Sequence, residues 1–353
     1  MVKITINDNV SKLKQKSKAK NTQDKYEGDW LKFTNYCQNK YLCNPLDVDD
    51  LDSAYALTAN YMDWLHEDPE AKVFKGSSNI PGREKLNNNP YSSSPYKAST
   101  IQRILASITY KYRMNGFQFD RKHPDISETI ASIQINQKNI RSGEAKELLK
   151  DDIIKIIDSI PEDENDFRAI RDKALILLGF YSFCRRSEIL GMKFNHLEFL
   201  DEGIQILIPF SKTDQIGEGR YIFIAKKNDK YCPVNSLKKW LEIIRIENED
   251  PLFYSINKSN KFNKYMLNKK NQKISLSDSS FVKILKNRAQ LAGLNEIEKI
   301  SGHSLRRGAI SEARRNDLSI NDIKAQSGHK SSQMIDLYSK VSDIKKTSVT
   351  KKI

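Results

Sequence analysis

Three short clusters of the sequence carry most of the residues that could do chemistry. They are FCRRSEIL at 183–190, SGHSLRRGA at 301–309 and SGHKSSQMIDLYSK at 327–340. Each contains arginine or histidine, and the third contains a tyrosine, Tyr338, close to its end. Brought together, such side chains could break a phosphodiester bond without a metal. The tyrosine would attack, cations would hold the non-bridging oxygens, and an acid would protonate the leaving oxygen.

A tyrosine nucleophile has consequences for cofactors. Attack on phosphorus would form a covalent phosphotyrosine, which divides the transfer into two steps and conserves the bond energy for resealing. No nucleotide cofactor is then needed. No carboxylate cluster suited to Mg²⁺ accompanies the cations, and the four cysteines lack the spacing of a zinc site, so we expect no metal and no cofactor.

The order and spacing of the clusters resemble those of the tyrosine recombinase (phage integrase) family. That family has an arginine followed, after one residue, by Ser or Gly and then Glu. It also has a His-x-x-Arg, and a Gly-His that precedes the nucleophilic tyrosine. Its catalytic lysine lies on a hairpin between these clusters. The matching positions are Arg185, Glu188, Lys212, His303, Arg306, His329 and Tyr338.

The resemblance implies a role for each match. Tyr338 attacks the scissile phosphate to leave a 3′-phosphotyrosine, and Lys212 protonates the departing 5′ oxygen. Arg185 and Arg306 clamp the phosphate. Three residues have supporting roles. Glu188 orients Arg185, His303 assists proton transfer, and His329 donates a hydrogen bond to a phosphate oxygen.

Five further cations are predicted to contact DNA rather than to take part in the chemistry. The first three lie off the apolar stripe of a helix that we expect Ser99 or Thr100 to cap and that should end near Gly116. The other two are the second arginines of the first two clusters. The set is Arg103, Lys111, Arg113, Arg186 and Arg307.

The elements that must position these residues are mainly helical. Periodic apolar residues predict helices on both sides of a polar, basic stretch at 137–146. Since 353 residues exceed the usual size of one core, we expect two domains that clamp DNA. The predicted parts are a basic disordered arm (1–20), a helical N-terminal DNA-binding domain (21–136), a linker (137–146) and a catalytic domain (147–353). The polar stretch at 67–98 is expected to be a long exposed loop.

The catalytic domain should also carry a small β-sheet. GIQILIPF at 203–210 and RYIFI at 220–224 are rich in β-forming residues and flank SKTDQIGEG. This pattern predicts a hairpin with Lys212 near its tip and Arg220 across the same turn. A hairpin lysine that only touches the DNA backbone is the alternative for Lys212.

The charge of the chain agrees with a nucleic-acid partner. Fifty-nine Lys and Arg against 45 Asp and Glu give +14, which favours a polyanion, with an acidic membrane surface as the second choice. No apolar run could span a bilayer, so we expect a soluble intracellular protein, which would lie in the cytoplasm or nucleoid if its host is a prokaryote. The resemblance implies binding to a specific site in double-stranded DNA, as a dimer on one site and a homotetramer on two duplexes.

Two other functions fit part of the pattern. A type IB topoisomerase would use similar chemistry as a monomer, without a specific site. The stretch from Gly308 to His329 also reads as a helix-turn-helix, which would suit a non-enzymatic DNA-binding protein.

Overall fold

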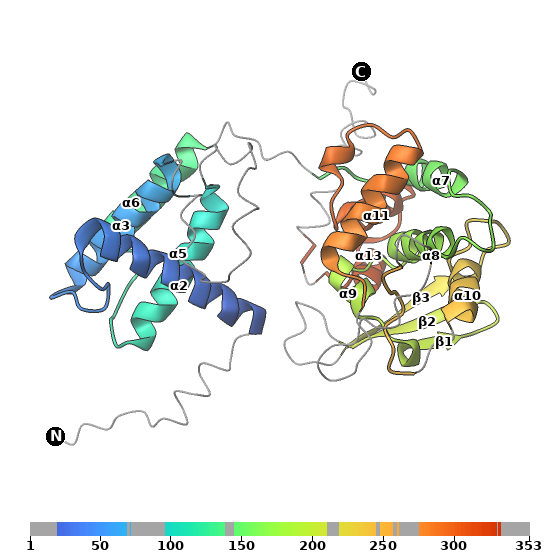
Figure 1. The fold of residues 1–353 in the computed structure, drawn as a ribbon, viewed down its shortest axis with the longest axis horizontal. Coiled ribbons are helices and arrows are strands. Elements are labelled where there is room, and N and C mark those ends of the chain that lie inside the picture. The colour runs from blue at the N-terminus through green and yellow to red at the C-terminus, as the bar shows by residue number, and fades with distance from the viewer. Residues whose placement is uncertain are drawn as a thin grey trace. The chain divides into compact units, whose positions relative to one another are not determined.

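The computed structural model describes residues 20–68, 71, 96–137, 145–209, 219–244, 248–256, 260, 275–329 and 331–332. They belong to two compact units, Met1–Ser142 and Gly143–Ile353 (Figure 1). Lys212 and Tyr338 lie outside the described residues, as does most of the predicted arm, of the polar stretch 67–98 and of the linker.

The first unit is built from helices with an aromatic core. Asp50 begins one of them, because its carboxylate accepts a hydrogen bond of 2.7 Å from the N–H of Ser53. Phe33, Tyr61 and Tyr112 are buried, and the ring of Phe33 packs against the rings of both tyrosines. The helices are α2 (Lys20–Tyr41), α3 (Leu51–Glu67), α5 (Ala98–Met114) and α6 (Pro124–Asn136).

Helix α5 begins slightly earlier than the sequence predicted. It starts at Ala98, after Lys97, whose side chain makes no capping hydrogen bond, so neither Ser99 nor Thr100 is the cap. Its end agrees with the prediction, since Gly116 follows with a φ of 90°, a conformation that glycine adopts without steric cost.

The second unit surrounds one long buried helix, α8 (Phe167–Tyr181). Its residues 174–178 are all fully buried, and α10 (Pro233–Ile244) and α12 (Ser304–Arg315) pack against it. Gly308 lets α12 approach the backbone closely, because a Cβ atom there would lie 1.7 Å from the carbonyl oxygen of Leu148. The remaining helices are α7 (Lys150–Asp158), α9 (Arg186–Gly191), η2 (Phe194–His196), α11 (Asp278–Leu291), η3 (Ile297–Lys299) and α13 (Ile320–Ser327).

A three-stranded antiparallel sheet lies beside these helices, in the order β1 (Leu197–Phe199), β2 (Gly203–Ile208), β3 (Arg220–Ala225) (Figure 1). The predicted hairpin is confirmed as β2 and β3, and β1 is an additional strand. Ile222 and Ile224 point into the core, whereas Tyr221 and Phe223 are exposed, as the alternation of a strand requires. The fold class is therefore confirmed as mainly α with a small β-sheet.

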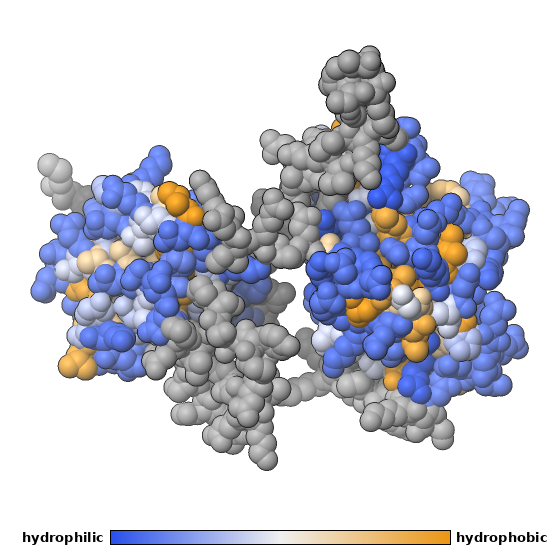
Figure 2. Space-filling view, turned by 90° about the horizontal axis from the view of Figure 1, so that it is seen from above, coloured by the Kyte–Doolittle hydropathy of each residue, from blue (hydrophilic) through white to orange (hydrophobic). Residues whose placement is uncertain are grey.

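On the face that Figure 2 shows, the described residues of each unit are mostly hydrophilic. In Figure 2 apolar residues form scattered small groups on the visible face of each unit. No described helix has both the length and the apolar character to cross a membrane.

Candidate active site

The centre of the site is the carboxylate of Glu188, whose side chain is only 3% exposed. Arg185 immediately precedes α9, and its backbone N–H donates a hydrogen bond of 2.8 Å to Glu188 Oε2. The guanidinium of Arg185 donates to Oε1 of the same carboxylate, also at 2.8 Å. Two hydrogen bonds thus join Arg185 to Glu188, three residues later, and they fix the position of Arg185.

Arg306 joins all three sequence clusters. Its side chain, on α12, is 4% exposed, and its Nη1 donates to the carbonyl oxygens of Phe183 at 2.7 Å and Ser327 at 2.8 Å. Burial, and then the nearby cation Arg185, lower the pKa of Arg306 to about 10, so it stays charged at neutral pH. Phe183 has a φ of 57°, a strained conformation that costs about 1–3 kcal/mol. That strain coincides with the turn that aims its carbonyl at Arg306.

His329 contacts the guanidinium of Arg306. It follows Gly328, which ends α13 with a φ of 69°. Nη2 of Arg306 lies 2.9 Å from His329 Nε2, and Ser327 Oγ lies 2.8 Å from Nδ1. Because arginine has no acceptor, we assign Nε2 as the acceptor and place the proton on Nδ1, from which it is donated to Ser327. Burial, and then Arg306 and Arg185, lower the pKa of His329 to about 4, so the imidazole is neutral.

Arg220 is a member of the cluster to which the sequence analysis assigned no role. Its Nη2 lies 3.3 Å from Glu188 Oε2, 3.3 Å from the carbonyl oxygen of Ser327 and 3.6 Å from the sulfur of Cys184. The predicted hairpin is the sequence feature that could have identified Arg220. Arg220 pairs with Ile208, so it lies where β2 and β3 meet the turn.

The cluster is cation-rich. Three guanidinium groups, those of Arg185, Arg220 and Arg306, lie within 4.0 Å of the single carboxylate of Glu188, which leaves a net charge of +2. Cys184 does not change this sum, because burial raises the pKa of its thiol to about 11. A net positive charge that is largely shielded from solvent attracts an anion, and guanidinium groups suit the oxygens of a phosphate.

His303 and the two extra arginines lie around this cluster. His303 is exposed directly before α12, one helical turn before Arg306, and its backbone N–H donates to Ser301 Oγ at 3.2 Å. Both extra arginines are ion-paired. Arg186 pairs with Asp278 at 2.6 Å, and Arg307 pairs with Glu147 at 3.2 Å.

The three cations predicted on α5 lie at the surface of the first unit and are paired within it. Arg103 forms an ion pair with Asp29, and Lys111 forms one with Glu27 at 2.5 Å, so both connect α5 to α2. Nε of Arg113 donates to a nearby backbone carbonyl, that of Phe119, at 2.9 Å. Contact of these residues with DNA stays a prediction.

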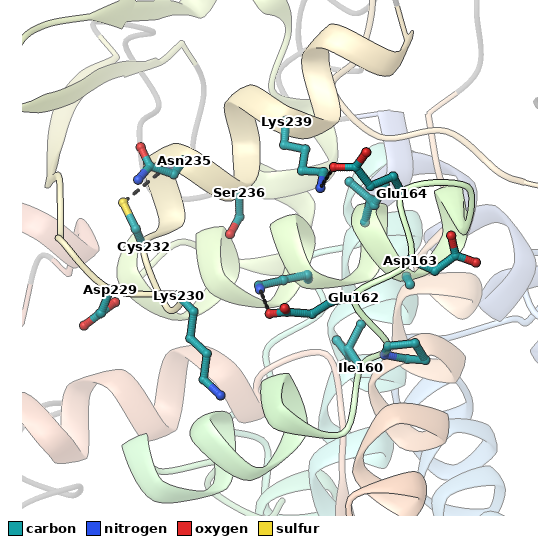
Figure 3. Close-up of a pocket in the computed structure, with 14 residues that line it drawn as sticks. Ile160, Glu162, Asp163, Glu164, Asp229, Lys230, Cys232, Asn235, Ser236 and Lys239 are labelled. Atoms are coloured by element: carbon teal, nitrogen blue, oxygen red, sulfur yellow. Dashed lines mark hydrogen bonds and ion pairs between the residues drawn. The ribbon is translucent and has the colours of Figure 1, made fainter.

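A hollow of about 410 Å³ lies at the other end of α8 (Figure 3). Its lining comes from the first turns of α8, the loop before them and the start of α10. Two of its lysines are paired with acids, Lys173 with Glu162 and Lys239 with Glu164. The last α8 residue of this lining is Lys173, which lies eight residues before Tyr181 and thus roughly 12 Å from it along the helix axis. Among the described residues, no group of three or more His, Cys, Asp or Glu could hold a metal ion.

Comparisons with known proteins agree with the composition of this site. Residues 146–344 match the model of the phage integrase family. The integrase/recombinase XerD homolog of Selenomonas ruminantium is 30% identical over 329 residues, covering 92% of this chain and 82% of that protein.

Two solved structures show a weaker likeness. The lambda integrase (75–356) dimer bound to a COC′ core site has 15% identity and a TM-score of 0.49, covering 94% of this chain and 93% of that one. The XerA recombinase has 15% identity and a TM-score of 0.41, covering 93% and 90%. At these values neither structure bears on the roles of individual residues.

Proposed function

The chain belongs to the phage integrase family of enzymes that cleave and rejoin DNA strands, and we propose how its own residues carry out site-specific recombination. The observation that carries the proposal is the net charge of +2 around the buried carboxylate of Glu188. A phosphodiester has one negative charge, and a second develops as a nucleophile adds to phosphorus. Preorganised cations therefore stabilise the transition state more than the ground state.

Arg185 and Arg306 are proposed to hold the two non-bridging oxygens. Both are already fixed before DNA binds, Arg185 by Glu188 and Arg306 by two backbone carbonyls. Nη2 of Arg306, which donates to His329, can transfer this hydrogen bond to a phosphate oxygen. His329 is then released from its role as acceptor, and the negative phosphate beside it raises its pKa, so it can donate to the same phosphate.

The bond changes follow from this arrangement. The oxygen of Tyr338 attacks phosphorus and loses its proton, with His303 assisting, while the bond from phosphorus to the 5′ oxygen breaks. Lys212 gives a proton to that oxygen. The 3′-phosphotyrosine keeps the energy of the broken bond, and a 5′ hydroxyl from another strand reverses the step to complete the exchange. No metal or cofactor takes part.

The assembly and its DNA contacts belong to the same proposal. The enzyme would bind a specific site in double-stranded DNA as a dimer, and two occupied sites would form a homotetramer with a Holliday-junction intermediate. The N-terminal unit would contact DNA through Arg103, Lys111 and Arg113. Arg186 and Arg307 would contribute phosphate contacts next to the catalytic cluster.

The test is an adduct that survives SDS. Wild type, Tyr338→Phe and the control Tyr221→Phe are incubated with DNA that flanks the native gene, and trapped DNA is sequenced. Tyr221 is a suitable control because it is 65% exposed on β3. We expect adducts with wild type and Tyr221→Phe only. An adduct that survives Tyr338→Phe would remove Tyr338 from the mechanism.

A plasmid assay separates recombination from topoisomerase activity. We expect no efficient relaxation of a supercoiled plasmid that lacks the recombination site. Rapid turnover on such a plasmid would favour the type IB topoisomerase instead. A non-enzymatic helix-turn-helix protein would bind DNA in both assays and form no adduct.

A further inference from the structure

Arg220 connects three segments that the proposed mechanism needs in register. It is the first residue of β3 and follows Lys212 by eight positions along the hairpin. Its Nη2 contacts Glu188, which holds Arg185, and the carbonyl oxygen of Ser327, two residues before His329. One nitrogen atom therefore contacts the start of α9 and the end of α13 from the base of the hairpin.

The side chain also fits closely against the end of α13. A Cβ atom at Gly328 would lie 2.8 Å from Nε of Arg220 and 3.0 Å from its Cζ. Gly328 therefore serves two needs, a positive φ and room for the guanidinium. Because His329 directly follows Gly328, the position of Arg220 affects where His329 lies.

The partners of Arg220 do not need it for their own hydrogen bonding. Glu188 keeps two hydrogen bonds from Arg185, and the carbonyl of Ser327 keeps one from Arg306. Removing Arg220 would therefore orphan neither of these buried oxygens. Arg220 itself has buried Nε and Nη1 atoms with no hydrogen-bond partner among the described residues, which costs free energy.

We propose that Arg220 is a positioning residue for DNA cleavage, which aligns the hairpin, Arg185 and the His329 segment without touching the reacting atoms. This inference rests on the proposed function. A residue kept for stability should have all its donors paired and its partners dependent on it. Among the described residues, Nε and Nη1 of Arg220 have no hydrogen-bond partner, and its two partners keep other hydrogen bonds without it. Its contribution should therefore be found in the rate of the chemical step rather than in the stability of the fold.

The experiment compares Arg220→Met with the control Lys226→Met, which removes one positive charge from an exposed residue just beyond the other end of β3. Three quantities are measured: thermal unfolding, the Kd for site DNA, and the single-turnover rate of adduct formation at saturating DNA. For Arg220→Met we expect near wild-type unfolding, a Kd within about threefold and a rate lowered roughly 10²-fold, as small misplacements of reacting groups produce. Lys226→Met should cleave at the wild-type rate.

Two further variants test the route through Glu188. Arg220→Lys keeps the charge and three donors, so it should recover part of the rate. The double variant Arg220→Met, Glu188→Gln should cleave no more slowly than the slower single variant, because both changes disturb the same alignment.

Several outcomes would overturn the proposal. These are an unaltered rate, a loss of rate explained entirely by weaker binding, strictly additive effects in the double variant, or strong destabilisation by Arg220→Met. The last would make Arg220 a structural residue. Failure of the proposed function is distinguishable, because wild type itself would then form no adduct.

Discussion

The protonation of His329 offers a quantitative test of the site. Its neutral imidazole accepts from Arg306, and burial together with Arg306 and Arg185 lowers its pKa from 6.5 to about 4. An unfolded chain has no such surroundings, so its histidine protonates first as the pH falls below 6.5. Because the unfolded state then binds more protons, stability decreases between pH 6.5 and about 4. The difference in pKa corresponds to a loss of about 3 kcal/mol.

The assay must report on the catalytic unit alone, because two units need not unfold together. The chain has three tryptophans, and Trp240 is the one in the catalytic unit, fully buried with its Nε1–H donated to the carbonyl of Leu252. Replacing Trp30 and Trp64 by Phe leaves Trp240 as the fluorescent reporter. Urea unfolding at a series of pH values then compares this background with the same protein carrying His329→Asn, which has no imidazole to protonate.

From pH 7 to pH 4, the free energy of unfolding should fall by about 3 kcal/mol more in the protein that keeps His329 than in the His329→Asn variant. The proton NMR signal of His329, identified by its absence from the variant, should titrate near pH 4. A constant stability difference, or titration near 6.5, would refute the geometry that places His329 against Arg306.

Three other predictions concern packing, charge and metals. Gly308→Ala should destabilise the catalytic unit by about 3 kcal/mol in urea unfolding, because its Cβ would collide with the carbonyl of Leu148. Gly191→Ala, with no heavy atom within 4 Å, is the control and should be nearly neutral. Arg306→Ala should raise the cleavage barrier by about 3–4 kcal/mol, and a near wild-type rate would transfer the role to Arg307. EDTA should leave adduct formation unchanged, whereas loss of cleavage restored by Mg²⁺ would contradict the metal-free mechanism.

Much of the fold could be predicted from local pattern. The apolar period of the helices and the β-rich runs around a polar turn are properties of neighbouring residues, so the hairpin and the mainly helical class follow from them. Strand β1 has only three residues, too few to show an alternation. The start of α5 was misplaced because Lys97 precedes it without a side-chain capping bond, whereas the sequence offered Ser99 and Thr100 as caps.

The sequence by itself predicted Arg185, Glu188, Arg306 and His329, which the structure brings together, and it determined the local geometry within each cluster. Arg185 and Glu188 are one helical turn apart, as are His303 and Arg306, so each pair is adjacent in any helix. Only the tertiary structure brought Arg220 to Glu188, across 32 positions, and Arg306 to the carbonyl of Phe183, across 123. Spacing along the chain carries no information about such distant contacts, and burial depends on everything packed around a group. The net charge of the cluster and the lowered pKa of His329 are therefore properties of the folded chain.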